Sequence, residues 1–339
     1  MQIALNIFLL MLGFALLIQS AKIFVNASVG IATRLRVPTM VIGLTVVAMG
    51  TSAPEVVISV SAAIGGSSDL AIANAVGANL FNLLFIVGFC AMLYPITVQM
   101  ADISRDYWVS VVATIVLLVM VIIFADNVIP RFGGLIFLVG FFTYMFIVVR
   151  HALRNKTEDA GEEDKDAASH FSTGKESLPV ENQTNEKAAN VMPLWKCIVL
   201  AVVGIAVIVG AGQLTVSSAV NIATSLGITE RVIGLTIVSI GTSLPELVTT
   251  IIACRKKEGE FALGFIIGSS IFNIMFVLGL AGVVVPLTVE RNVIFDIAVL
   301  TVGMLAFFLC AKSGKKLVRA EGLFLVLGYL GYMVWVVLL

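Results

Sequence analysis

The sequence predicts an all-α membrane protein with ten transmembrane helices, arranged as two inverted five-helix repeats with broken helices at the membrane midplane. Three observations lead to this fold class. Hydrophobic residues make up 59% of the 339 residues and the mean hydropathy is +1.07, while charged residues make up only 12%, against about 25% in soluble proteins. Apolar runs recur at lengths close to the ~20 residues that cross a bilayer as a helix. The two halves of the chain also share a long stretch of related sequence.

Ten apolar segments account for most of the chain. The first continues well past the length of a signal-peptide core, so we interpret it as a transmembrane span. The ten segments cover residues 3–30, 38–64, 70–94, 107–125, 132–149, 194–222, 232–253, 261–285, 293–311 and 321–338. They divide the chain into a first five-helix repeat (1–150), a polar linker (151–192) and a second, inverted five-helix repeat (193–339).

Charge placement predicts the orientation of these segments. Residues 155–190 carry nine acidic and four basic side chains and almost no large apolar ones, which is typical of a solvated loop. Seventeen of the 21 Lys and Arg residues lie in connections on the same side as this loop, and three lie on the other side. Because cytoplasmic connections carry the basic excess, both termini are expected outside and the 155–190 loop in the cytoplasm. The formal net charge of +0 argues against a nucleic-acid partner.

The two halves are related by a shift of 191 residues. Residues 31–98 align with 222–289 without a gap, and 26 of these 68 positions are identical. Three motifs recur in the alignment: VIGLT at 41 and 232, GTSxPE at 50 and 241, and GxxxFN at 77 and 268. Since each half has an odd number of spans, the second copy enters the membrane from the opposite side. Inverted repeats of this kind are typical of transporters that hold their substrate near the midplane.

Glu55 and Glu246 lie near the middle of two spans, at equivalent positions of the repeat. A charged group at this depth costs at least about 2.5–3.5 kcal/mol, so two of them need an explanation. An ion pair is one alternative, but Lys22 is the single basic residue well inside a span and cannot easily pair with both. The in-plane symmetry axis would bring the two carboxylates together, and a bound cation would relieve their repulsion. The pair therefore predicts a cation site.

The rest of the repeated motif is rich in oxygen ligands. Hard cations such as Ca²⁺ take six to eight oxygens, and the motif supplies four hydroxyls and two amide oxygens: Thr51, Ser52, Thr242, Ser243, Asn82 and Asn273. Pro54 and Pro245 lack an N–H and so break the helix, which frees backbone carbonyls. A simple helix kink, or asparagine bonding between helices, is the alternative. No His, Cys or Asp joins the set, which argues against zinc or another soft metal and against a catalytic triad. We expect no cofactor and no enzymatic activity.

These motifs resemble the paired repeats of the calcium/cation antiporter superfamily, and more narrowly the prokaryotic sodium/calcium exchanger group. The resemblance covers nearly the whole chain. It implies Na⁺-driven Ca²⁺ export by alternating access in a prokaryotic plasma (inner) membrane, with the first and sixth spans sliding against the other eight. It also implies the ion ligands: Glu55 and Glu246 centrally, with Thr51, Thr242, Ser52, Ser243, Asn82, Asn273, Ser269 and the backbone carbonyls of Ala48 and Ser239. Glu55, Glu246, Thr51 and Thr242 would be the Ca²⁺ ligands.

Two positions depart from the family pattern. Ala78 stands where the second half has Ser269, and Asn273 stands where some relatives have aspartate, which leaves two carboxylates in the site. Exchange of a divalent cation against H⁺ is therefore the alternative within transport, and a cation channel is the alternative from another class. The expected partners are membrane lipids and the transported cations. No obligate protein partner is evident in the sequence.

Overall fold

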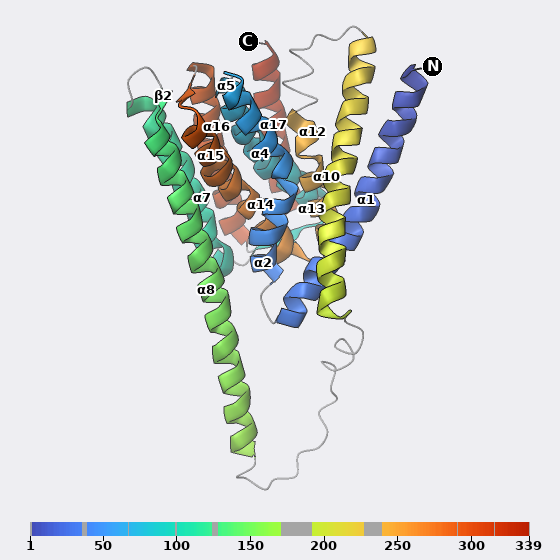
Figure 1. Ribbon diagram of the computed structural model, residues 1–339. Coiled ribbons are helices and arrows are strands. Elements are labelled where there is room, and N and C mark those ends of the chain that lie inside the picture. Colours follow the sequence, from blue (N-terminus) through green and yellow to red (C-terminus); the bar gives the residue numbers. More distant parts are fainter. Residues whose placement is uncertain are drawn as a thin grey trace.

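The structure is a computed structural model, and it describes residues 2–35, 39–66, 68–98, 100–123, 128–170, 192–226, 239–289, 291–314 and 316–338. Two long helices, α1 (Gln2–Leu35) and α10 (Leu194–Ser225), lie side by side along one flank of a bundle that holds the other helices (Figure 1). The two chain ends lie at one end of the molecule, and the far end of α8 lies at the other (Figure 1). The overall arrangement is an all-α bundle.

The described elements follow the same order in both halves of the chain. The first half contains α1, α2 (Thr39–Ile42), the π-helix η1 (Gly43–Val47), α3 (Ala48–Thr51), α4 (Ala53–Ile64), α5 (Ser68–Leu80), the π-helix η2 (Phe81–Ile86), α6 (Val87–Leu93), β1 (Ile96–Thr97), α7 (Met100–Ile123), β2 (Val128–Ile129) and α8 (Arg131–His170). The second half contains α10, α12 (Ser239–Thr242), α13 (Leu244–Arg255), α14 (Gly259–Ile271), the π-helix η5 (Phe272–Val277), α15 (Leu278–Val284), β3 (Leu287–Thr288), α16 (Arg291–Gly314), β4 (Lys316–Leu317) and α17 (Arg319–Leu338).

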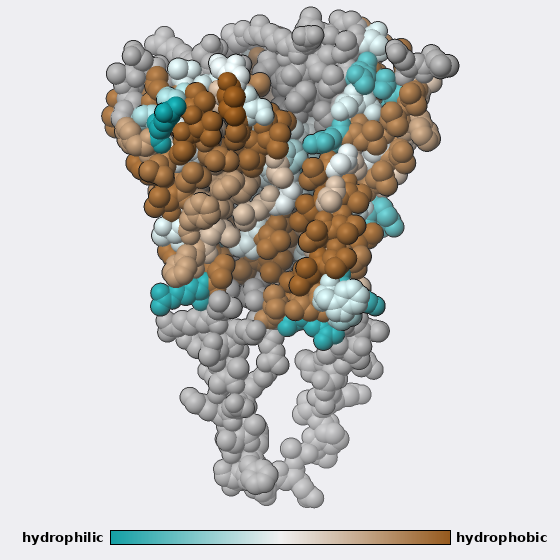
Figure 2. Space-filling view, viewed as in Figure 1, coloured by the Kyte–Doolittle hydropathy of each residue, from teal (hydrophilic) through white to brown (hydrophobic). Residues whose placement is uncertain are grey.

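The molecule carries the surface of an integral membrane protein. Within the described residues, eight helices are long and apolar enough to cross a membrane, and the bent pair Gly43–Thr51 and Ala53–Ile64 is a ninth candidate. On the face that Figure 2 shows, hydrophobic side chains cover most of the middle of the bundle, and hydrophilic ones gather toward its two ends. The span expected at 232–253 begins in residues outside the described part, which resumes at Ser239 with α12 and α13.

Helix α14 is the most enclosed element of the bundle. All of its residues from Phe261 to Ile271 are buried. It packs against η1 so closely that a Cβ added to Gly268 would lie 2.4 Å from the Leu44 carbonyl oxygen. A Cβ at Gly43 would similarly lie 2.7 Å from the Phe261 carbonyl oxygen. Glycine at these two positions therefore lets two backbones touch at the centre of the protein.

Contacts between the two halves come in matched pairs. Helix α6 packs against α17, and α15, which is the repeat equivalent of α6, packs against α8. The short strands behave in the same way. Ile96 and Thr97 of β1 pair antiparallel with Leu317 and Lys316 of β4, and β2 pairs antiparallel with β3. Each of these contacts joins one element of the first half to one of the second, so the two halves pack directly against each other at several places.

The polar linker is helical over its first part, where we expected a loop from residue 155. Helix α8 continues without interruption to His170. The absence of large apolar residues does not prevent a helix. Ala, Glu and Lys are good helix formers, and a helix already nucleated by a transmembrane span propagates at little cost. The rest of the linker, residues 171–191, lies outside the described part of the chain.

Candidate functional site

Both repeated motifs break their helices at the serine before the proline. Ser52 separates α3 from α4 with φ −84° and ψ 12°, and Ser243 separates α12 from α13 with φ −90° and ψ 7°. Pro54 and Pro245 stand in the first turn of the following helix, where a missing N–H costs nothing. In the first half the two helix segments meet at a bend of 54°. The break predicted from proline is thus confirmed in both motifs.

The break places each glutamate in the first turn of a new helix, Glu55 in α4 and Glu246 in α13. Both side chains are buried, with 1% and 0% of their surface exposed. The positive end of the helix dipole stabilises a carboxylate there. No ion pair is recorded for either glutamate within the described residues, and the nearest polar partners are hydroxyls. The ion-pair alternative therefore finds no support.

Each glutamate is held by the serine of the other motif. Ser52 Oγ donates to Glu246 Oε1 at 3.0 Å, and Ser243 Oγ donates to Glu55 Oε1 at 3.4 Å. These two bonds are equivalent under the 191-residue shift, and each joins the serine of one motif to the glutamate of the other. Thr242 also faces the Glu55 carboxylate, and Thr51 faces that of Glu246. The structure therefore brings the two copies of GTSxPE into one buried site.

The last turn of α14 and the π-helices η2 and η5 complete the site. Ser52 Oγ lies 2.8 Å from Ser269 Oγ, and Asn82 Nδ2 donates to Ser269 Oγ at 3.3 Å. Asn82 and Asn273 each lie in a π-helix, η2 and η5 respectively. A π-helix turns its carbonyls and side chains out of α-helical register and is often found at functional sites. Both asparagines and Ser269 are almost fully buried.

Four buried oxygens in this site have no hydrogen-bond partner among the residues that the structure describes: Glu55 Oε2, Glu246 Oε2, Asn82 Oδ1 and Asn273 Oδ1. They form two pairs that are equivalent in the repeat, and all four can only accept. Leaving a buried acceptor unpaired costs about 1–3 kcal/mol, more for a charged group. Two carboxylate and two amide oxygens of this kind match the preference of hard cations. No cluster of three His, Cys, Asp or Glu side chains is found in the described part of the chain, so a soft-metal site has no support there.

The remaining predicted ligands are placed less clearly. Thr51 Oγ1 donates along its own helix to the carbonyls of Val47 and Ala48, at 3.2 and 3.4 Å. The Ala48 carbonyl also accepts the Ser52 N–H at 3.1 Å, so it already has two donors. Ser239 is the first described residue of α12, and its side chain lies outside the described part. Thr242 lies beside the site and is 7% exposed.

A small cavity reaches the motifs from the side of α10. It has a volume of about 200 Å³ and borders both prolines and Thr242, with Gln213 and Ser217 of α10 on its outer side. Both of these α10 residues are exposed. Apolar side chains such as Val57, Ile58 and Val209 form much of its lining, and neither Glu55 nor Glu246 borders it.

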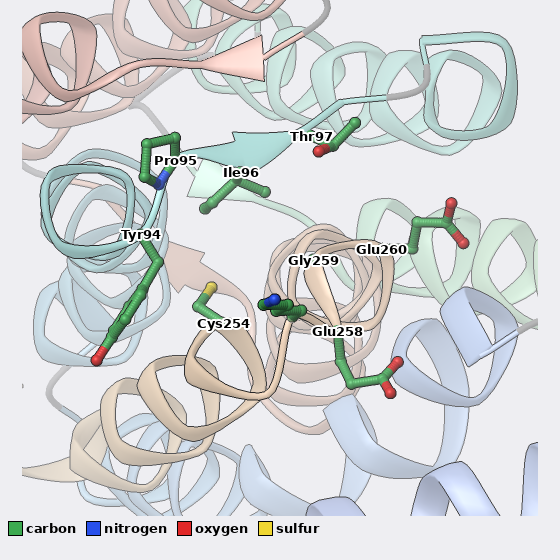
Figure 3. A pocket seen from close by; sticks show the side chains of 9 residues that line it. Tyr94, Pro95, Ile96, Thr97, Cys254, Glu258, Gly259 and Glu260 are labelled. Atoms are coloured by element: carbon green, nitrogen blue, oxygen red, sulfur yellow. The ribbon is translucent and has the colours of Figure 1, made fainter.

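A wider pocket, of about 620 Å³, lies away from the site where α13 meets α14 (Figure 3). Glu258 and Glu260 extend from the start of α14 beside it, and Tyr94 to Thr97 form its opposite wall (Figure 3). Burial, and then the nearby Glu260 carboxylate, raise the pKa of Glu258. None of the predicted ion ligands lines this pocket.

Sequence reasoning missed a further buried asparagine of the site. Asn79 Nδ2 donates to the Ser270 carbonyl at 3.1 Å, and Asn79 Oδ1 accepts from Asn273 Nδ2 at 3.1 Å. The signal was present, because Asn79 stands inside the GxxxFN motif three residues before Asn82. It was overlooked because its repeat equivalent, Ser270, is not an asparagine.

Comparison with known proteins places this geometry in a family. The model of the family described as "Sodium/calcium exchanger protein" matches residues 5–150 and 196–338. The putative antiporter CaxA of Alkalimonas amylolytica is 35% identical over 95% of both chains. The sodium/calcium exchanger MaX1 of Methanosarcina acetivorans is 31% identical over 98% of both chains. A solved structure of the sodium-calcium exchanger NCX_Mj, soaked with 10 mM Na⁺ and no Ca²⁺, matches with a TM-score of 0.79 and 27% identity, covering 98% of this chain and 99% of that one.

Proposed function

Because the chain belongs to the sodium/calcium exchanger protein family, we propose that it is a secondary antiporter that exchanges Ca²⁺ for Na⁺ by alternating access. The cations would bind between Glu55 and Glu246. The observation that carries this proposal is the set of four buried, unpartnered oxygens at equivalent positions of the two halves. Two carboxylates balance the charge of one divalent ion or of two monovalent ions, so the same oxygens can serve either cargo in turn.

The contacts of the site fit competition between the two ions. Ser52 donates to one oxygen of Glu246, and Ser269 accepts from the Nδ2 of Asn82, which leaves Glu246 Oε2 and Asn82 Oδ1 for a cation. Asn82 and Asn273 add neutral oxygens without adding negative charge. A Na⁺ ion needs fewer charged ligands than Ca²⁺, and hydroxyls such as that of Ser269 are suitable for it. Thr51, Thr242 and the carbonyls of Ala48 and Ser239 stay as proposed additional ligands.

We further propose that residues 1–150 and 193–339 are inverted five-helix repeats joined by the 151–192 linker. Two equivalent contacts between the halves support this arrangement. Helix α6 of the first half packs against α17 of the second, and α15, the repeat equivalent of α6, packs against α8 of the first half. At the centre, the two serine–glutamate hydrogen bonds also join the halves at equivalent positions, and so support the same arrangement. In the alternating-access step, α1 and α10, which pack together on one flank (Figure 1), would slide against the rest of the bundle.

The basic side chains favour an orientation with both termini outside, in a prokaryotic inner membrane. The two chain ends lie at the end of the molecule opposite to the end of α8 (Figure 1), as this orientation requires. The last turn of α1, which carries exposed Arg34, and the first turn of α10, which carries exposed Lys196, lie toward that end of α8 (Figure 1). The named relatives from a bacterium and an archaeon are consistent with this membrane.

Exchange of Ca²⁺ against H⁺ is the second candidate, because buried carboxylates can carry protons. Flux of radioactive Ca²⁺ into one batch of everted vesicles separates the two. We expect an imposed Na⁺ gradient to drive Ca²⁺ movement and a pH gradient without Na⁺ to drive none. Flux with the pH gradient alone would replace Na⁺ by H⁺ in the proposal. Uncoupled, non-saturating current would instead indicate a channel.

Deletion of residues 160–188 should leave the Na⁺-driven Ca²⁺ flux close to that of the full chain. The linker contributes none of the described site residues, and the halves are already interlocked through the α6–α17 and α8–α15 contacts. The measurement is initial flux per inserted protein. Loss of all flux from a correctly inserted deletion variant would show that the linker takes part in transport.

A further inference from the structure

The two asparagines of the site are oriented by different neighbours. In the first half, Asn82 Nδ2 donates to Ser269 Oγ, and this leaves Asn82 Oδ1 unpartnered. The equivalent contact for Asn273 would be with residue 78, which is alanine and has no acceptor in its side chain. Asn273 Nδ2 donates instead to Asn79 Oδ1 at 3.1 Å. The neighbouring position thus supplies the acceptor that Ala78 lacks.

The orientation of Asn79 is itself fixed by a group that can only accept. Its Nδ2 donates to the backbone carbonyl of Ser270, at 3.1 Å. Its Oδ1 must then face Asn273, and Asn273 must present Nδ2, since two carbonyl oxygens would repel. The free Oδ1 of Asn273 consequently points away from Asn79 and is one of the four unpartnered oxygens. Because the Ser270 backbone carbonyl can only accept, it fixes the orientation of the Asn79 amide, and Asn79 then fixes that of Asn273. The orientation of both amides therefore does not depend on how their O and N atoms were assigned.

We propose that Asn79 is a positioning residue that holds the Asn273 carbonyl oxygen toward the transported cation. Asn79 is fully buried and both of its bonds cross between the halves, α5 to α14 and η5. Its oxygen accepts from Asn273 and is not one of the four unpartnered oxygens of the site, so we give it no ligand role. Without it, the Asn273 amide is free to turn its N–H₂ toward the cation, which replaces attraction by repulsion. This inference rests on the proposed cation site.

The test uses substitutions that remove or restore the acceptor. Asn79→Leu removes it at similar size, and the double variant Ala78→Ser with Asn79→Leu restores it from the position that Ser269 occupies in the other half. Ala78→Ser alone measures the effect of the added hydroxyl. Thr114→Val is the matched control, since Thr114 is a buried residue whose hydroxyl bonds only to Ser110 in its own helix. The readouts are the half-saturating Ca²⁺ concentration for transport and the Ca²⁺-dependent rise in Tm of the purified protein.

We expect Asn79→Leu to raise the half-saturating Ca²⁺ concentration about tenfold, the factor of one lost ion–dipole contact. The double variant should return to within about threefold of wild type. A general packing defect would not be rescued by a hydroxyl at position 78. If Asn79→Leu does not reach the membrane, Asn79→Ser, which is too short to reach both partners, takes its place with the same expected direction.

The outcomes separate the inference from the proposed function. Wild-type affinity in Asn79→Leu, or no rescue by Ala78→Ser, overturns the positioning role while Ca²⁺ transport by the wild type stands. A wild-type protein with neither Ca²⁺ flux nor Ca²⁺-dependent stabilisation overturns the proposed function, and the positioning role with it.

Discussion

Glu246→Gln is expected to abolish Na⁺-driven Ca²⁺ transport while the protein still inserts in the membrane. The amide removes a full negative charge from a fully buried position and replaces the unpartnered Oε2 or its mate by an N–H₂ group that repels cations. We expect the half-saturating Ca²⁺ concentration to rise at least about 100-fold, which corresponds to about 2.7 kcal/mol. Insertion should be retained or improved, because a neutral side chain is less costly at this depth. The measurement is radioactive Ca²⁺ flux, normalised to protein in the membrane.

Glu55→Gln should behave in the same way, since Ser243 holds Glu55 as Ser52 holds Glu246. Glu260→Gln is the matched control, because Glu260 is an exposed glutamate of the same half and contributes nothing to the site. Its flux should equal that of the wild type. Retention of normal Ca²⁺ affinity by either site variant would show that its glutamate is not a cation ligand.

Gly268→Ala is expected to disrupt the bundle at its centre. The added Cβ would lie 2.4 Å from the Leu44 carbonyl oxygen and 2.6 Å from the Leu44 Cα, and neither backbone atom can move aside as a flexible side chain would. Overpacking of this kind costs about 1–3 kcal/mol, so we expect Tm to fall by at least about 3 °C. Transport should fall as well, because Ser269 follows directly and would be displaced from Ser52.

The matched control for this change is Gly328→Ala in α17. A Cβ at Gly328 meets nothing within 4 Å, and alanine is favoured over glycine in a helix by roughly 0.5–1 kcal/mol. Tm should therefore stay the same or rise slightly. Equal stability of Gly268→Ala and wild type would mean that the contact between α14 and η1 is looser than the structure shows.

The sequence predicts the central part of this site because its chemistry is carried by rare residues. A glutamate at mid-membrane depth, a proline that breaks a helix and an exact repeat spacing each point to one place, and the structure brings Glu55, Glu246, Asn82, Asn273 and Ser269 together there. The hydroxyls are harder to predict, since a Thr or Ser in a helix can bond to its own backbone instead. Thr51 does so, and no sequence pattern distinguishes it from Ser52, which bonds across the halves.

Asymmetry between the halves is the second limit. Reasoning by repeat assigns equal roles to equivalent positions, and this fails where one copy has changed. Ala78 was recognised as a departure, but the acceptor that replaces it comes from Asn79, one position along, and only the three-dimensional contact reveals it. The sequence also does not predict the π-helices, because one wider turn within a helix changes neither the composition nor the hydrophobic pattern.

The crossed serine–glutamate bonds also bear on how such a chain could arise. Neither half contains both partners of a bond, so under the inverted arrangement a single-repeat ancestor could build a site only from two copies inserted in opposite directions. Gene fusion through a tether would fix one copy in each direction. It would also free the two copies from having to be identical, and the difference between Ala78 and Ser269, with Asn79 as the acceptor for Asn273, is one that a symmetric dimer of identical copies could not contain.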